Sequence, residues 1–244
     1  MGTELIYQHK NQLISLNDTS SVWQEYYELT ESQGTKIQAT FNNESVDIID
    51  WYNKDFGFRI VANQFNSVFF PIMTTAIPVS GILRGISEYE NTYEAFRSIE
   101  LPHNVYLITY AMDHILQHST KLLNKQISIS FAGWVYSLAH QQKPPIYKQN
   151  GKIVTTRGSS IFYHPPEKEN DLQDYIYQFY VEEVNSWLWN NSLIIYKIKT
   201  TFFRLPGITV PIVLYATERV LQENYIPKVG DDIMGILWLV SQIT

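Results

Sequence analysis

Alternation between two kinds of side chain near the C-terminal end constrains the fold more than any other feature of the chain. Aromatic, branched and hydroxyl residues occupy the even positions from Tyr196 to Phe202, and Lys197 and Lys199 occupy odd positions between them. A β-strand places successive side chains on opposite faces, so this pattern predicts a strand over residues 193–203 with one buried face.

Other runs rich in aromatic and β-branched residues predict further strands. Residues 175–189 fit either a strand or an amphipathic helix, and their many rings favour the strand. Four or five short strands follow residue 175, which is typical of a small barrel or a strongly bent sheet. In strand number and spacing this region resembles the oligonucleotide/oligosaccharide-binding (OB) barrel. Predicted strands elsewhere are 36–49, 58–61, 67–72, 126–136, 210–215 and 233–240.

Helices are predicted in three places. Ser21 and Gln24 fit a capping box, and Gly34 is a suitable stop for the helix that follows. A second, short helix is expected over residues 91–99. A third is expected over residues 105–116, where apolar side chains recur every three or four positions, although the start of this segment also fits a strand.

Proline and glycine concentrate in residues 141–170, which we interpret as the boundary between two units. Asn150-Gly151 within this segment favours a two-residue hairpin turn between flanking strands. The predicted domains are an N-terminal α+β unit, residues 1–140, and a C-terminal β-rich, barrel-like unit, residues 141–244. The expected class is therefore α+β, mostly antiparallel β, with small barrel-like units and a few helices.

A short similarity also suggests an internal duplication. Val-Ser-Gly-Ile-Leu-Arg-Gly-Ile-Ser at residues 79–87 resembles Ile-Met-Gly-Ile-Leu-Trp-Leu-Val-Ser at residues 233–241. Chance recurrence of a short apolar string is the alternative explanation. The matching pairs are Gly81/Gly235, Ile82/Ile236, Leu83/Leu237 and Ser87/Ser241.

The distribution of charge limits the class of partner. Residues 1–122 contain 7 Lys/Arg and 14 Asp/Glu, and residues 123–244 contain 11 and 10. An acidic first half repels a phosphate backbone, so nucleic acid is a poor partner, whereas a basic protein is favoured. The chain has no cysteine, which excludes thiolate chemistry and disulfides. Neither a signal-peptide pattern nor an apolar run of membrane-spanning length is present, so we expect a cytoplasmic protein without a membrane partner.

Five aromatic side chains are candidates for ligand binding. Rings two residues apart on a strand share a face and could form a stacking platform for a sugar. The same rings would form ordinary core if that face were covered. The candidates are Trp187, Trp189, Trp238, Tyr175 and Tyr177.

His114 and His118 are the candidate metal ligands. Four residues apart on a helix, two imidazoles would point to the same side, but no glutamate between them supplies a general base. A zinc site would need a third ligand, for which His140, His164 or an Asp could serve; the alternative is a pair of solvated histidines. No phosphate-binding or dinucleotide-binding glycine motif occurs, so we predict neither a cofactor nor catalytic residues. Asp231 and Asp232 after Gly230 indicate a turn.

These patterns favour a non-enzymatic binding protein that acts through a β-sheet face or edge, either toward a basic protein partner or in self-association. An immunity-like or accessory role in a bacterium fits this description. The alternatives are a carbohydrate or small-ligand binding module that uses the rings named above, and a metal-dependent hydrolase that uses His114 and His118.

Overall fold

The structure, a computed structural model, describes residues 19–89, 93–117, 119–143, 146–149, 152–164, 174–189 and 193–244. These residues are mostly in strands, as the sequence predicts, with one α-helix and short 3₁₀ turns. No helix among them is long and apolar enough to cross a membrane. The elements are α2 (Thr19–Gln33), β1 (Thr35–Phe41), β2 (Glu44–Asn53), β3 (Phe56–Ala62), β4 (Ser67–Met73), β5 (Val79–Glu88), β6 (Ala95–Leu101), β7 (Val105–Ala111), β8 (Gln126–His140), β9 (Ile146–Gln149), β10 (Lys152–Thr155), β11 (Ile161–Tyr163), β12 (Asp174–Tyr180), β13 (Glu183–Trp189), β14 (Leu193–Leu205), β15 (Ile208–Thr217) and β16 (Asp232–Ile243), with 3₁₀ turns at Pro102–Asn104, Ser119–Leu122, Glu218–Val220 and Gln222–Asn224.

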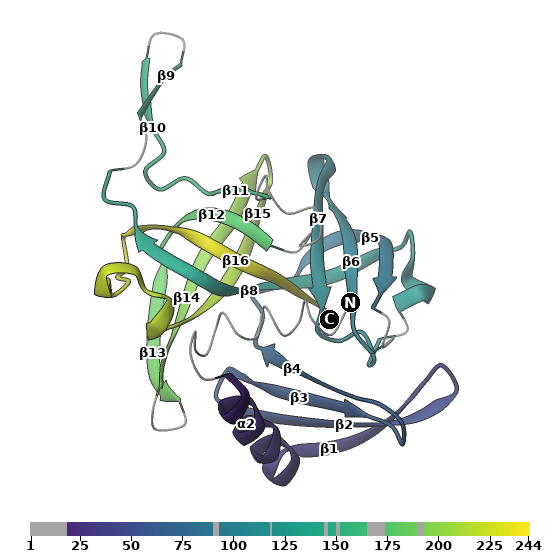
Figure 1. The fold of residues 1–244 in the computed structure, drawn as a ribbon. Coiled ribbons are helices and arrows are strands. Elements are labelled where there is room, and N and C mark those ends of the chain that lie inside the picture. The colour runs from purple at the N-terminus through teal and green to yellow at the C-terminus, as the bar shows by residue number, and fades with distance from the viewer. Residues whose placement is uncertain are drawn as a thin grey trace.

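An antiparallel sheet of four strands, in the order β1-β2-β3-β4, forms a small layer that is covered by α2 (Figure 1). Tyr26 of the helix stacks on Phe58 of β3 with ring centroids 5.3 Å apart. The helix is described from Thr19, the first described residue, so Ser21 lies inside it and is not its N-cap. Thr19 and Ser20 also carry hydroxyls before the first apolar position, so the sequence pattern alone does not select Ser21.

The second sheet has ten strands in the order β11-β12-β16-β7-β6-β5-β8-β15-β14-β13. It is mixed, because β8 pairs with β15 and β7 pairs with β16 in parallel, whereas the other pairs are antiparallel. Strands from both sides of the predicted boundary at residues 140 and 141 belong to this sheet. Residues 79–87 lie on β5 and residues 233–241 on β16, and both of these strands pair antiparallel with β8.

A closed circuit of strand pairing lies within this large sheet. β5, β6 and β7 form a meander, β7 pairs with β16, β16 pairs with β8, and β8 pairs back to β5. Shifts of register between Leu83 and Gly85 and between Ile236 and Leu237 mark bulges. Bulges bend strands and increase their twist, which helps the sheet to close on itself.

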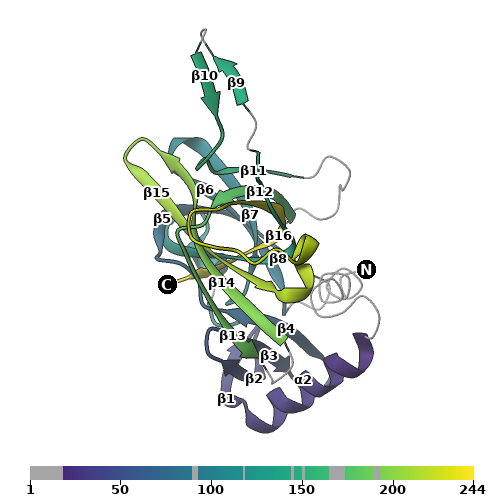
Figure 2. The same cartoon turned by 90° about the vertical axis from the view of Figure 1, so that its left-hand side faces the viewer.

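Two clusters of buried hydrophobic side chains stabilise these layers. One consists mostly of residues from the strands of the large sheet and includes Leu83, Ile99, Phe179 and Leu237. The other joins α2 and β2–β4 to the outward face of the large sheet. Figure 2 shows the small layer against one end of the large sheet, with the β9–β10 hairpin at the opposite end. The chain is therefore a layered β structure with a separate hairpin, whose two strands the sequence predicted correctly.

Two predicted helices are wrong. Residues 95–101 and 105–111 instead form β6 and β7, which pair with each other from Phe96 opposite Tyr110 to Leu101 opposite Val105. The apolar residues of β7 satisfied a helical spacing and a strand spacing equally, and neighbouring strands decided between them. In β6, buried and partly buried residues alternate strictly.

Candidate functional site

Trp187, Trp189 and Trp238 lie on a face of the large sheet that the small layer covers. Their exposed fractions are 8%, 1% and 2%. The Trp189 ring contacts Tyr26 at 4.5 Å and Phe56 at 5.3 Å between centroids, and both partners belong to the small layer. The rings share a face, but this chain's own N-terminal layer occupies it, so here they serve as the core between two sheets.

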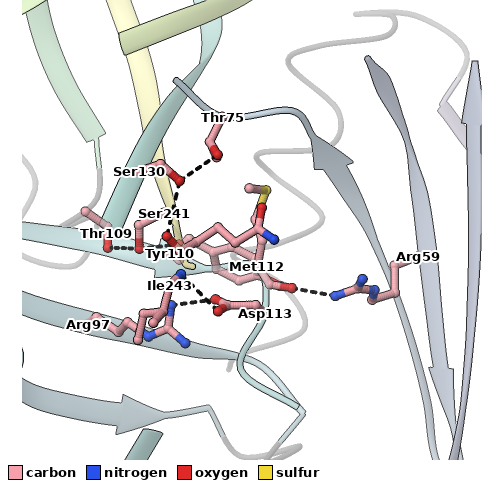
Figure 3. A network of polar contacts seen from close by, with 11 residues as sticks. Arg59, Thr75, Arg97, Thr109, Tyr110, Met112, Asp113, Ser130, Ser241 and Ile243 are labelled. Atoms are coloured by element: carbon pink, nitrogen blue, oxygen red, sulfur yellow. Dashed lines mark hydrogen bonds and ion pairs between the residues drawn. The ribbon is translucent and has the colours of Figure 1, made fainter. Parts of the chain in front are cut away.

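Polar contacts around these rings connect the small layer to the large sheet. Arg59 of β3 donates from Nη1 to the carbonyl oxygen of Met112, 2.8 Å away (Figure 3). Its other nitrogens bind the Asp50 carboxylate at 2.6 Å. Lys197 of β14 donates to Asp55 at 2.8 Å, and the Tyr215 hydroxyl donates to the carbonyl of Thr74 at 2.9 Å. The small layer is thus fixed to the large sheet from both sides of the aromatic cluster.

Asp113 connects the turn after β7 to the last strand, as Figure 3 shows. One carboxylate oxygen pairs with Arg97 Nη1 at 2.5 Å, and the other accepts the backbone N–H of Ile243 at 3.0 Å. Both charged side chains are buried. Thr109 and Ser241 add a hydroxyl pair at 2.6 Å. The geometry is that of a buried ion pair with a structural role, because each charged group is buried against a partner within the protein.

Tyr175 and Tyr177 lie on β12 and point into the core of the large sheet, each 1% exposed. The Tyr175 hydroxyl accepts the N–H of Ile108 at 3.0 Å and donates to the carbonyl of the same residue at 3.2 Å. It thereby satisfies both backbone groups of Ile108. Burial raises the pKa of Tyr175 to about 12, and burial also raises the pKa of Tyr177.

His114 lies in a turn after β7 and not on a helix, and His118 lies outside the described residues. The His114 side chain is 3% exposed, its ring lies against Phe41, and its Nε2 is 3.5 Å from a carboxylate oxygen of Glu88. Within the described part of the chain, no three or more His, Asp or Glu side chains are grouped so that they could hold a metal ion.

A polar pocket of about 430 Å³ lies where β8 ends and β16 begins. Asp231 accepts hydrogen bonds from the Tyr225 hydroxyl at 2.5 Å and from the N–H of Lys228 at 3.1 Å, so it forms the turn that the sequence indicated. Asp232 accepts the N–H of Gly158 at 2.7 Å. Both carboxylates therefore stabilise loops by accepting hydrogen bonds from loop residues. The pocket is lined by His140, Gln141, Gln142, Arg157, Gly230, Asp231 and Asp232.

An open strand edge is the surface that most resembles a binding site. Among the described strands, β1 pairs with β2 alone, in unbroken register from Thr35 to Phe41. Asn42 and Asn43 have φ of 51° and 66°, which is a type I′ turn. In such a hairpin the residues that flank the turn exchange hydrogen bonds, and the direction of the backbone groups then alternates along the strand. The N–H and C=O groups of Lys36, Gln38 and Thr40 therefore point away from β2.

This edge has few of the features that usually protect a sheet. β1 contains neither proline nor a bulge, and its first four side chains are exposed. Its single lysine, Lys36, pairs with Asp47 at 2.7 Å, and hydrogen bonds from Lys36 and Gln38 lower the pKa of that carboxyl. Residues 19–53, which form α2, β1 and β2, contain six Asp or Glu and one Lys; Asp47 is paired with Lys36 and Asp50 with Arg59, and the other four are glutamates. We refer to β1 and these acidic surroundings as the acidic edge.

Sequence reasoning did not select Lys36, Gln38 or Thr40. The sequence shows that the first half of the chain is acidic, but the order of the strands decides which of them lies at an edge. No protein-family model matches the chain, and comparisons with curated proteins and with solved structures found no match.

Proposed function

We propose that the protein is a binding protein that takes up a basic, extended segment of its partner along the acidic edge. The partner segment would add a fifth strand beside β1, as peptides do when they join an exposed sheet edge. The observation that carries this proposal is the outward-pointing backbone of Lys36, Gln38 and Thr40 on a strand with one partner among the described strands.

Charge would select the partner. Lys36 is neutralised by Asp47, and Glu25, Glu28 and Glu31 are exposed on α2, which packs on β2 and β3 of the same small layer. Complementary charge speeds encounter and disfavours acidic competitors. Backbone hydrogen bonds would then supply affinity that depends little on the partner's exact sequence.

For the architecture, we propose that the closed circuit of β5, β6, β7, β16 and β8 is an OB-like barrel. Five strands, a three-stranded meander and one parallel pair support this proposal. The barrel would carry residues 141–231 as an insertion between β8 and β16. The internal duplication stays a prediction.

A short synthetic peptide tests the proposed function. The probe is a labelled seven-residue peptide of alternating lysine and valine, and fluorescence anisotropy measures its binding to the whole chain. Gln38→Pro removes one outward N–H and places a ring in the path of the incoming strand. We expect binding to weaken at least ~10-fold, since one lost hydrogen bond and a steric block are together worth about 1.4 kcal/mol or more.

Gln38→Ala is the matched control, because it keeps the N–H and loses the same side-chain contact with Asp47, which is 3.2 Å long. It should bind the peptide like the unaltered chain. A peptide of alternating glutamate and valine should bind more weakly than the lysine–valine peptide. Added salt should reduce the difference in affinity between the two peptides, because it screens charge. Equal binding to Gln38→Pro and Gln38→Ala would show that the β1 edge is not the binding site.

A further inference from the structure

The β9–β10 hairpin forms a two-stranded sheet of its own. Lys152 to Thr155 pair with Gln149 to Ile146, and neither strand joins another described sheet. Figures 1 and 2 show the hairpin extending away from the body. An isolated two-stranded hairpin is marginally stable in water. Ile146 at its base is 69% exposed. The hairpin therefore has the form of an element that becomes stable when a further strand or sheet joins it.

Its composition is the opposite of that of the acidic edge. Residues 143–157 contain Lys143, Lys148, Lys152 and Arg157 and no acidic residue. Residues 19–53 contain six acidic residues and one lysine. The two segments also lie at opposite ends of the molecule in both views (Figures 1 and 2). Contact between them is thus a contact between two copies of the chain.

We propose that the basic β9–β10 hairpin of one copy docks on the acidic edge of a second copy and extends its sheet beyond β1. This inference rests on the proposed function and names a second copy of this chain as the partner. The contact is heterologous, since a different surface is used on each copy, so it links copies head to tail. Strands of four residues against one of seven make a small interface, which predicts association at micromolar or higher concentration.

Sedimentation equilibrium of the full chain over ~10–500 µM, the range expected for a small interface, tests this arrangement. The average mass should rise above that of the monomer with concentration and should rise less in high salt. Lys148→Glu with Lys152→Glu, and separately Gln38→Pro, should each weaken association at least ~10-fold. Gln38→Ala, and Lys148→Arg with Lys152→Arg, are the matched controls and should associate like the unaltered chain.

Mixing the two defective proteins is the decisive measurement. The lysine-to-glutamate variant retains an intact edge, and Gln38→Pro retains an intact hairpin, so an equimolar mixture should form dimers and nothing larger. A monomeric mixture, a monomeric unaltered chain, or unimpaired assembly of Gln38→Pro would overturn the inference.

Circular dichroism checks that each variant folds, and Thr40→Pro replaces Gln38→Pro if that variant does not fold. If the lysine–valine peptide binds at β1 while the chain stays monomeric, only the self-association fails. If Gln38→Pro changes neither measurement, the proposed function fails as well.

Discussion

At the scale of single residues, Tyr175 shows how one side chain replaces a missing strand. β16 pairs with β7 at Tyr110 and Ala111, and the Tyr175 hydroxyl serves both backbone groups of Ile108 further along β7. A buried backbone group without a partner costs about 1–3 kcal/mol, so a phenol with a donor and an acceptor suits this position. The side chain that the sequence made a ligand-binding candidate completes the sheet in the structure.

This role predicts a dependence of stability on alkaline pH. The pKa of Tyr175 is about 12 in the folded protein and near 10 when the side chain is free, because burial disfavours the charged phenolate. The contribution of Tyr175 to the unfolding free energy is therefore complete below pH 10 and is lost as the pH rises through 12. Relative to Tyr175→Phe, the unaltered chain should lose roughly 2–3 kcal/mol of unfolding free energy over this interval. Urea unfolding of both proteins at pH 9, 10, 11 and 12 measures this, and a constant difference between them would contradict the assignment.

At the scale of elements, Gly235 marks a close approach between β16 and β8. A Cβ added to Gly235 would lie 1.7 Å from the carbonyl oxygen of Ser137, next to the register shift in β16. Only a residue without a Cβ fits there unless the two backbones separate. A Cβ added to Gly85, by contrast, would lie 3.5 Å from the nearest side-chain atom.

Gly235→Ala should therefore destabilise the protein by about 3 kcal/mol, since the clash is with backbone that cannot move aside cheaply. Gly85→Ala is the matched control and should change stability by less than about 0.5 kcal/mol. Thermal or urea unfolding of both variants compares the two costs. Similar stability of the two would mean that β16 and β8 lie farther apart at this point.

Strand identity was largely predictable from local sequence. Residues 193–203 and the segments around Asn150-Gly151 were identified by two-residue alternation and by turn chemistry, and both lie in strands. Residues 95–101 and 105–111 were predicted as helices, because apolar residues at spacings of three and four also fit a strand with a mixed burial pattern. Pairing between distant segments, such as β8 with β16, leaves no trace in local periodicity. The acidic edge was unpredictable for the same reason, since edge position is a property of strand order.

At the scale of the whole molecule, the two sheets share one aromatic cluster. Phe56 of the small layer contacts Trp134 and Trp189 of the large sheet, each at 5.3 Å between ring centroids. A cluster with members from both layers links their stabilities, so we expect the described layers to unfold together.

Phe56→Ala should lower the unfolding free energy by about 3–5 kcal/mol, because it leaves a cavity between the sheets. Tryptophan fluorescence and far-ultraviolet circular dichroism should still report one coincident urea transition. Phe65→Ala, at a residue that is 76% exposed, is the control and should change stability by less than about 0.5 kcal/mol. Two separate transitions would mean that the layers unfold independently.

The closed circuit of β5, β6, β7, β16 and β8 has a consequence for biosynthesis. β8 leaves the ribosome long before β16, because residues 141–231 must be translated between them. At ~5–20 residues per second, the growing chain would wait roughly 5–20 s with one side of β8 unpaired. Apolar strands left open for that time are prone to aggregate, so newly made chains would depend on chaperones much more than the completed protein does.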